Sequence, residues 1–167
     1  MNESNVPLIP SQEVVNAFTS SAITALQELT QLEAFAEATH DPSAAVFAGD
    51  VVLATVRLER STPGTMALAM EGEVASCLAS RYLPAGSQLN EDIIDDVIGE
   101  FANVIAGQAK TILKGTPYHF LMSIPVVTRT DGIAHATFLT ASKLVASLET
   151  EHGRILVFAD VPRCPGG

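Results

Sequence analysis

Hydrophobic residues between Asn90 and Gly115 recur at steps of three, four and seven, which is the spacing of one helix face. This apolar face comprises Ile94, Val97, Ile98, Phe101, Val104, Ile105 and Ile112. Asn90 is suited to the N-cap position, and acidic residues fill the first turns. Lys110 and Lys114 precede Gly115 at the other end, where a basic last turn and a glycine commonly terminate a helix. The pattern predicts one long amphipathic helix over residues 90–115.

The N-terminal part of the chain also has helical periodicity. Ser11 can cap a helix that we expect to run to about Ala38, where Thr39-His40-Asp41-Pro42 would end it. Its apolar face would comprise Val14, Val15, Phe18, Ala22, Ala25, Leu26, Leu29, Leu32 and Phe35. A second, shorter helix is predicted over 71–82, before a loop over 83–88.

Strand patterns occupy most of the remainder. β-rich or alternating segments at 47–59, 65–70, 118–128, 133–140, 143–150 and 154–161 are separated by turn residues. This order predicts an α+β, two-layer fold in which helices cover one face of a mostly antiparallel sheet. We expect a single domain over 11–161, with a loose arm over 1–10 and a tail over 162–167. Lys143 to Val161 is predicted to include an exposed sheet edge that could pair with a second copy.

Composition narrows the class of protein. With 167 residues and 47% hydrophobic content, the chain is long enough to bury its own core. A net charge of −10 argues against nucleic-acid binding, which needs a basic footprint. No signal peptide and no membrane-spanning apolar stretch is visible, so a cytoplasmic location is expected.

Metal and nucleophile motifs are missing from the sequence. Cys77 and Cys164 lack C-x-x-C spacing and are expected to be reduced thiols of unassigned role. The four histidines are not at metal-ligand spacing, and neither a P-loop nor G-x-S-x-G is present. We therefore expect no metal site and no cofactor of the chain's own.

A polar stripe follows the opposite face of the predicted helix at 90–115. Asp96, Glu100, Asn103, Gly107, Lys110 and Lys114 succeed one another at steps of three and four. The ordinary interpretation is a solvated face. Gly99 and Gly107 each lower helix stability by roughly 1 kcal/mol relative to alanine. Two such residues on this side of the helix indicate that another group approaches the backbone closely. Asn103 is likewise unfavourable in mid-helix, so a functional interpretation competes with the ordinary one.

The stripe resembles a known signature. Asp96-x-x-x-Glu100-x-x-Asn103, followed 22 residues after the asparagine by Pro125, is similar to the motif of the CheC/CheX/FliY chemotaxis phosphatases. Residues 98–110 resemble the CheX form closely, and Ser123-Ile124-Pro125-Val126-Val127 resembles the strand that follows this helix in the family. The close resemblance covers residues 90–128.

This resemblance implies a fold of pseudo-duplicated helix-hairpin units and one active site. The N-terminal helix carries Gln12-Glu13-Val14-Val15-Asn16 and Gln27-Glu28-Leu29-Thr30-Gln31, neither of which is the E-x-x-N of two-site members. The implied activity is removal of the phosphoryl group from the aspartyl-phosphate of a phosphorylated CheY-like response regulator. The partner would supply Mg²⁺, the phosphoaspartate and a lysine. The resemblance also implies a homodimer joined through strand pairing.

Residue roles follow from the resemblance and from side-chain chemistry. Asn103 can donate and accept hydrogen bonds and would hold the attacking water, while Glu100 would pair with the partner's lysine. Gly99 and Gly107 would let the helix approach the regulator, and Asp96 would support the site. Pro125 is expected to shape a strand edge.

A second function remains open. The same helix could serve a non-catalytic receiver-binding or flagellar-motor-associated module.

Overall fold

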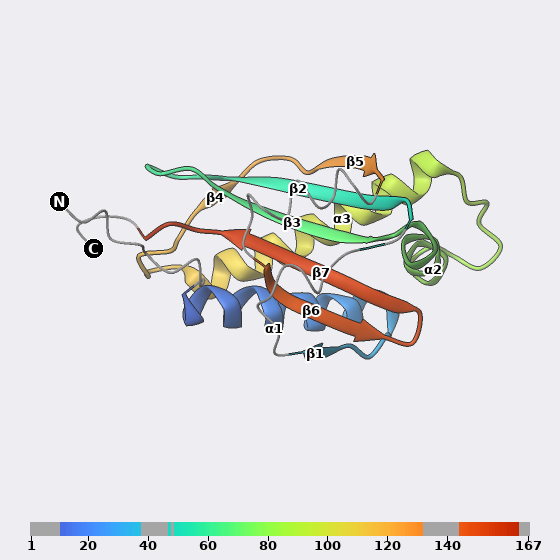
Figure 1. Cartoon of the computed structure of the whole chain (residues 1–167), viewed down its shortest axis with the longest axis horizontal. Helices are drawn as coiled ribbons and strands as arrows, with labels where there is room; N and C mark the ends of the chain where they lie inside the picture. The colour runs from blue at the N-terminus through green and yellow to red at the C-terminus, as the bar shows by residue number, and fades with distance from the viewer. Residues whose placement is uncertain (1–10, 38–46, 48, 132–143, 164–167) are drawn as a thin grey trace.

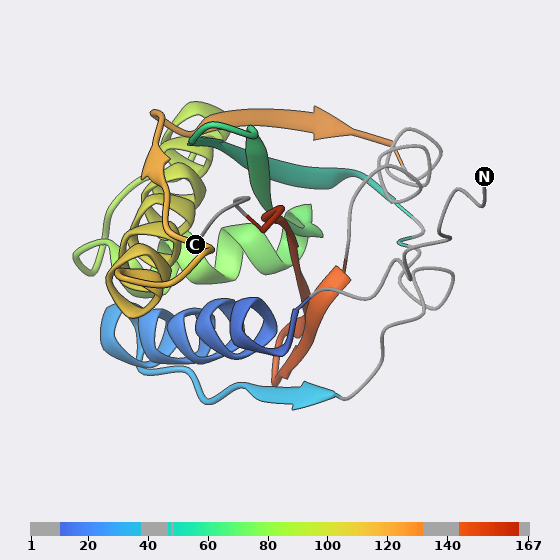
Figure 2. The ribbon, with the colours of Figure 1, turned by 90° about the vertical axis from the view of Figure 1, so that its left-hand side faces the viewer.

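The computed structural model describes residues 11–37, 47, 49–131 and 144–163, and the structural statements below concern these residues. They form three helices, which are α1 (Gln12–Thr30), α2 (Gly72–Tyr82) and α3 (Glu91–Leu113). The strands are β1 (Phe35–Glu37), β2 (Val51–Glu59), β3 (Gly64–Glu71), β4 (Leu121–Met122), β5 (Val126–Thr130), β6 (Leu144–Thr150) and β7 (Gly153–Asp160). The helices lie on one side of a curved sheet (Figures 1 and 2).

Antiparallel pairing joins the strands in the order β1-β6-β7-β3-β2-β4, and β5 also pairs with β2. The centre of the sheet consists of two hairpins, β2–β3 and β6–β7, joined where β3 pairs with β7. A helix precedes each hairpin, because α1 comes before β2–β3 and α3 before β6–β7. The predicted α+β fold with helices on a mostly antiparallel sheet is therefore confirmed.

The main core lies between the helices and the sheet. Its largest fully buried side chains include Phe18 of α1, Phe101 of α3, and Met66 and Leu68 of β3. The other face of the sheet carries a second buried cluster, formed by Phe47, Val51, Leu53, Ala67, Ala69, Leu144, Leu156 and Phe158. Because both faces are covered, Leu144 to Leu148 are all buried, in place of the alternation predicted for this strand.

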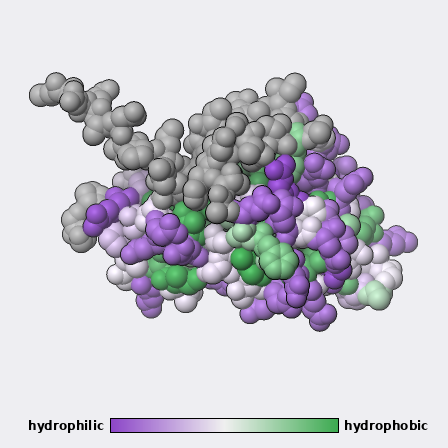
Figure 3. Space-filling view, turned by 60° about the horizontal axis from the view of Figure 1, so that its bottom comes forward, coloured by the Kyte–Doolittle hydropathy of each residue, from purple (hydrophilic) through white to green (hydrophobic). Residues whose placement is uncertain are grey.

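The N-terminal helix is shorter than predicted. Thr30 ends it, because its Oγ1 donates a hydrogen bond to the Leu26 carbonyl at 2.6 Å and accepts one from the Leu32 backbone N–H at 3.3 Å. Gln31 then adopts a left-handed conformation with φ of 58°. The chain continues into β1, where Phe35 is 68% exposed instead of buried on a helix face. Figure 3 brings the side of α1 and β1 forward, and the apolar atoms visible there form separate patches between polar ones.

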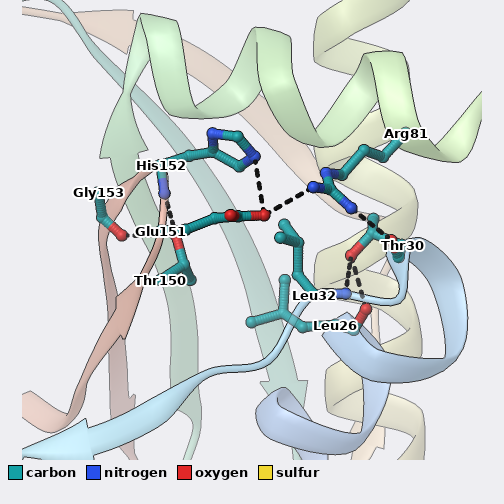
Figure 4. Close-up of polar contacts among 8 residues, drawn as sticks. All are labelled: Leu26, Thr30, Leu32, Arg81, Thr150, Glu151, His152 and Gly153. Atoms are coloured by element: carbon teal, nitrogen blue, oxygen red, sulfur yellow. Dashed lines mark hydrogen bonds and ion pairs between the residues drawn. The ribbon is translucent and has the colours of Figure 1, made fainter.

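Arg81 connects the end of α1 to the turn between β6 and β7 (Figure 4). From α2, its guanidinium donates to the Thr30 carbonyl at 3.5 Å and to Glu151 at 2.7 Å. His152 lies 3.6 Å from the same Glu151 oxygen. These side chains are partly solvated, so the Arg81–Glu151 pair contributes at most about 1 kcal/mol to stability.

The predicted sheet edge over 143–161 is wrong. β6 lies between β1 and β7, and β7 lies between β6 and β3, so neither is an outer strand. The reason is that the helical spacing continues through residues 35–37, whereas these residues form β1 and pair with β6. The strand predicted over 118–128 is interrupted and forms β4 and β5. The strand predicted over 133–140, the arm over 1–10 and residues 164–167 of the tail lie outside the described residues.

Two isoleucines of α3 provide a matched test of the core. Ile105 is 1% exposed in the main core, as predicted. Ile112, two turns later, was predicted on the same apolar face, and this prediction is wrong because its side chain is 53% exposed. Ile105→Asp should unfold the domain, since a lone buried carboxylate together with the lost apolar burial costs on the order of 4 kcal/mol or more. Ile112→Asp should lower stability by about 1 kcal/mol or less. Thermal melts followed by circular dichroism compare the two variants, and an equal loss of melting temperature would contradict the observed orientation of α3.

Candidate functional site

A surface cleft of about 510 Å³ separates α3 from the β4–β5 segment. Its helix wall consists of Asp95, Asp96, Gly99, Glu100 and Asn103, and its strand wall of Met122, Ser123, Ile124, Pro125 and Val127. The fold thus brings Pro125 to the residues of α3 with which the sequence motif groups it. Gly107 lies farther along the same face of α3 and does not line this cleft.

Helix α3 packs its apolar face against the core and exposes its polar stripe on the opposite face. The Asn90 side chain accepts a hydrogen bond from the Ile93 N–H at 2.9 Å and caps the helix, as predicted. Phe101, Ala102 and Ile105 are buried against the core. Glu100 and Asn103, which lie on the other side of the helix, are consequently exposed. A site on a helix that is packed in this way has a more defined position and direction than a site on a loop.

A β-bulge shapes the strand wall. β2 pairs Leu58 with Met122 of β4 and Thr55 with Val126 of β5, so the outer strand contains one more residue than β2 over this interval. Ser123 anchors the bulge, because its N–H donates to the Arg57 carbonyl at 2.9 Å and its Oγ accepts from the Arg57 N–H at 3.0 Å. Pro125 has no N–H to donate and is well suited to such an interruption.

Gly99, which lies beside the polar stripe, and Gly107, which lies within it, have different surroundings. A Cβ atom on Gly99 would lie 3.3 Å from Val127 Cγ2 and 4.0 Å from Pro125 Cβ. Gly99 therefore allows α3 to approach the chain's own strand wall, an internal contact that the sequence did not reveal. Apart from the adjacent residues and the local backbone of α3, a Cβ atom on Gly107 would meet no heavy atom of the described residues within 4 Å. Gly107 thus leaves a low, open surface within the stripe.

An ion pair that the sequence did not predict closes one end of the cleft. Arg129 of β5 donates two hydrogen bonds to Asp95 Oδ1, from Nε at 3.1 Å and from Nη2 at 2.8 Å. The pair ties β5 to the first turns of α3 and balances one carboxylate of an otherwise acidic wall. The two residues are far apart in sequence, so no local pattern could have revealed the pair before the fold was known.

Glu100 and Asn103 stand at the cleft with exposed side chains that make no hydrogen bond or ion pair to the rest of the described chain. A carboxylate can accept hydrogen bonds and pair with a cation, whereas an amide can donate and accept at once. No group of three His, Cys, Asp or Glu side chains among the described residues is placed to hold a metal ion. Glu100 and Asn103 can therefore orient a cation and a water molecule.

The sequence matches the family model described as "Chemotaxis phosphatase CheX" over residues 52–149, which is more than half of the chain. This match runs from β2 into β6 and includes all of the cleft residues named above. No curated protein is detectably similar in sequence. None of the described helices is both long enough and apolar enough to cross a membrane.

Solved structures share the fold at low sequence identity. The chemotaxis protein CheX of Desulfovibrio desulfuricans is 20% identical, with a TM-score of 0.69, over 90% of this chain and 99% of that one. CheX of Vibrio vulnificus is 21% identical, with a TM-score of 0.67, over 90% and 98%. A chain of the CheX–CheY–BeF₃–Mg²⁺ complex of Borrelia burgdorferi is 15% identical, with a TM-score of 0.59, over 90% and 98%.

The different surroundings of Gly99 and Gly107 predict opposite effects of one substitution. Gly99→Leu should lower the melting temperature, because a side chain there would push against Val127 and Pro125. Gly107→Leu should leave the melting temperature unchanged or raise it slightly, since leucine favours helix by several tenths of a kcal/mol over glycine. A Gly107→Leu protein that unfolds would show that this face packs against the core.

Proposed function

The chain belongs to the CheX family of chemotaxis phosphatases, and from this membership we propose that it hydrolyses the aspartyl-phosphate of a CheY-like response regulator. The observation that carries the proposal is the pair Glu100 and Asn103, exposed side by side at the cleft without partners in the described chain. The structural similarity to a CheX chain solved with CheY, BeF₃ and Mg²⁺ supports a partner of the same kind.

Asn103 orients the water in this mechanism. Its amide oxygen accepts a hydrogen bond from the water, and its N–H group helps to hold the water in line with the phosphorus. The water oxygen then bonds to phosphorus as the bond from phosphorus to the aspartyl oxygen breaks. The partner's aspartate leaves as a carboxylate, and both protons of the water leave with inorganic phosphate. Because Asn103 does not exchange a proton, its contribution is positioning.

Glu100 governs docking. The phosphoryl group and the carboxylates of Asp96 and Glu100 repel one another, so the complex requires positive charge from the partner. A lysine of the regulator, paired with Glu100, and the Mg²⁺ that the regulator holds would provide this charge. Asp96 lies one turn before Glu100 and supports the same acidic surface. Gly107 would leave room for the regulator's backbone beyond Asn103.

The proposal also includes a cytoplasmic location and a homodimer. The alternative of a non-catalytic receiver-binding or motor-associated module uses the same surface. The presence of both Glu100 and Asn103 favours the phosphatase, since binding alone does not require an amide that can orient water.

Separating docking from water positioning tests the proposed roles. Asn103→Ala should lower kcat for phosphorylated receiver by on the order of 100-fold while largely preserving receiver affinity. Glu100→Ala should mainly raise KM, because it removes the ion pair that docks α3. Phosphate release measured over a range of receiver concentrations yields both constants. Gly107→Leu, which the fold is expected to tolerate, should also raise KM.

Wild-type protein with acetyl phosphate in place of the receiver is the control. Hydrolysis should remain at the uncatalysed rate, since this small acyl phosphate brings neither the lysine nor the docking surface. An Asn103→Ala protein that retains full kcat at saturating receiver would rule out the role proposed for the amide.

The homodimer is tested by mass in solution. Since β6 and β7 are internal strands, a dimer joined by strand pairing must use β1 or the β4–β5 side among the described elements. Light scattering at micromolar concentration should give about twice the chain mass of 17.6 kDa. A monomer mass at all accessible concentrations would contradict the prediction.

A further inference from the structure

The outer strand beside the cleft carries three exposed apolar side chains. Leu121 is 61% exposed, Ile124 87% and Val126 62%. Leu121 and Val126 pair with Glu59 and Thr55 of β2, and their side chains face away from the helices. Ile124 instead lines the cleft as part of its strand wall, whereas Glu100 and Asn103 belong to its helix wall. The most exposed of the three side chains therefore belongs to the candidate site.

Backbone interactions of the neighbouring residues fix the position of Ile124. The preceding Ser123 is held by two hydrogen bonds to Arg57, and the following Pro125 has a restricted φ. Gly99 brings α3 close to Pro125 and Val127, so the same segment is supported from the helix side. Bulges beside functional sites commonly redirect one side chain, and this bulge presents Ile124 to solvent. Its exposure is therefore a structured feature of the strand wall.

The shape of the cleft favours a protein surface over a small ligand. It is open, and its helix wall presents three carboxylates, of which Asp95 is paired with Arg129. A molecule that reaches Asn103 with a phosphoryl group must offset the charge of Asp96 and Glu100. If it fills the cleft, it also contacts the strand wall that carries Ile124. Protein interfaces of this kind concentrate their binding energy in a few side chains that become buried near the centre.

We propose that Ile124 is an apolar anchor for the receiver domain of the response regulator. In the complex, its side chain inserts into an apolar recess of the receiver next to the phosphorylated aspartate. This inference rests on the proposed function and adds a second contact, on the wall opposite Glu100. The ion pair of Glu100 with the regulator's lysine and the burial of Ile124 then hold the receiver from both sides of the cleft. The phosphoryl group is thereby held next to the Asn103 amide.

Substitution of Ile124 by serine tests the anchor. Because the side chain is exposed and the hydrogen bonds of the bulge belong to Ser123, Ile124→Ser should retain the wild-type melting temperature. The probe is the CheY-type receiver of the same genome that the wild-type chain binds most tightly when the receiver carries BeF₃⁻ and Mg²⁺. Kd for that complex and KM for the phosphorylated receiver should both rise about tenfold, with kcat unchanged. Ile124→Val should restore most of the affinity.

Two other exposed apolar residues provide matched controls. Val126→Ser removes a side chain from the same strand on the face away from the cleft, and Ile112→Ser removes one from α3 near α1. Both variants should bind the receiver like wild type. A tenfold loss of receiver affinity in either control would overturn the assignment, because nonspecific hydrophobic contacts would then explain the effect of Ile124→Ser.

Failure of the inference is distinguishable from failure of the proposed function. If Asn103→Ala slows hydrolysis but Ile124→Ser leaves Kd and KM unchanged, the phosphatase stands and the anchor is wrong. If wild type binds the receiver without releasing phosphate, the proposed function fails while the Kd comparison still decides the anchor. If Ile124→Ser converts a dimer into a monomer without changing Kd, the residue contacts a second copy of the chain and the inference is overturned.

Discussion

The candidate site depends on the packing of one helix face. Phe101, Ile98 and Ile105 of α3 are buried in the main core, and they set the rotation of the helix about its axis. Because side chains three and four residues apart share a helix face, that rotation places Asp96, Glu100 and Asn103 together on the outer side. A rotation of one residue would carry the polar stripe toward the core. The burial that stabilises the domain therefore also aims the two side chains proposed to act on the regulator.

The second wall of the cleft depends on the relation between α3 and the outer strand. Gly99 permits the close approach, the Asp95–Arg129 pair ties β5 to the helix, and the bulge at Ser123 to Pro125 shapes the strand facing Glu100. Each of these contacts joins residues distant in sequence. Without these contacts, the polar face of α3 would be a solvated stripe. Together they place a second wall, which carries an apolar side chain, next to that face. This combination is suited to recognising a protein surface.

The sequence predicted the features that rest on local periodicity. Helix α3 was anticipated almost to its ends, because its apolar spacing, its Asn90 cap and its charge distribution all agree. The same periodicity does not show the end of α1, since Leu32 and Phe35 continue the helical spacing even though Thr30 and Gln31 terminate the helix. The prediction of a sheet edge over 143–161 is wrong for the same reason. The residues that continue the helical spacing form β1, and β1 pairs with β6. Ile124 falls within the strand predicted over 118–128, and only the register with β2 reveals the bulge that exposes it.

The most direct measurement is phosphate release with a limiting amount of this chain and a large excess of phosphorylated CheY-type receiver. If Glu100 and Asn103 act as proposed, each molecule of the chain should dephosphorylate many receivers, and the rate should rise in proportion to the amount of chain added. A chain that binds the phosphorylated receiver but leaves the rate of phosphate release unchanged would contradict the phosphatase and identify a binding module.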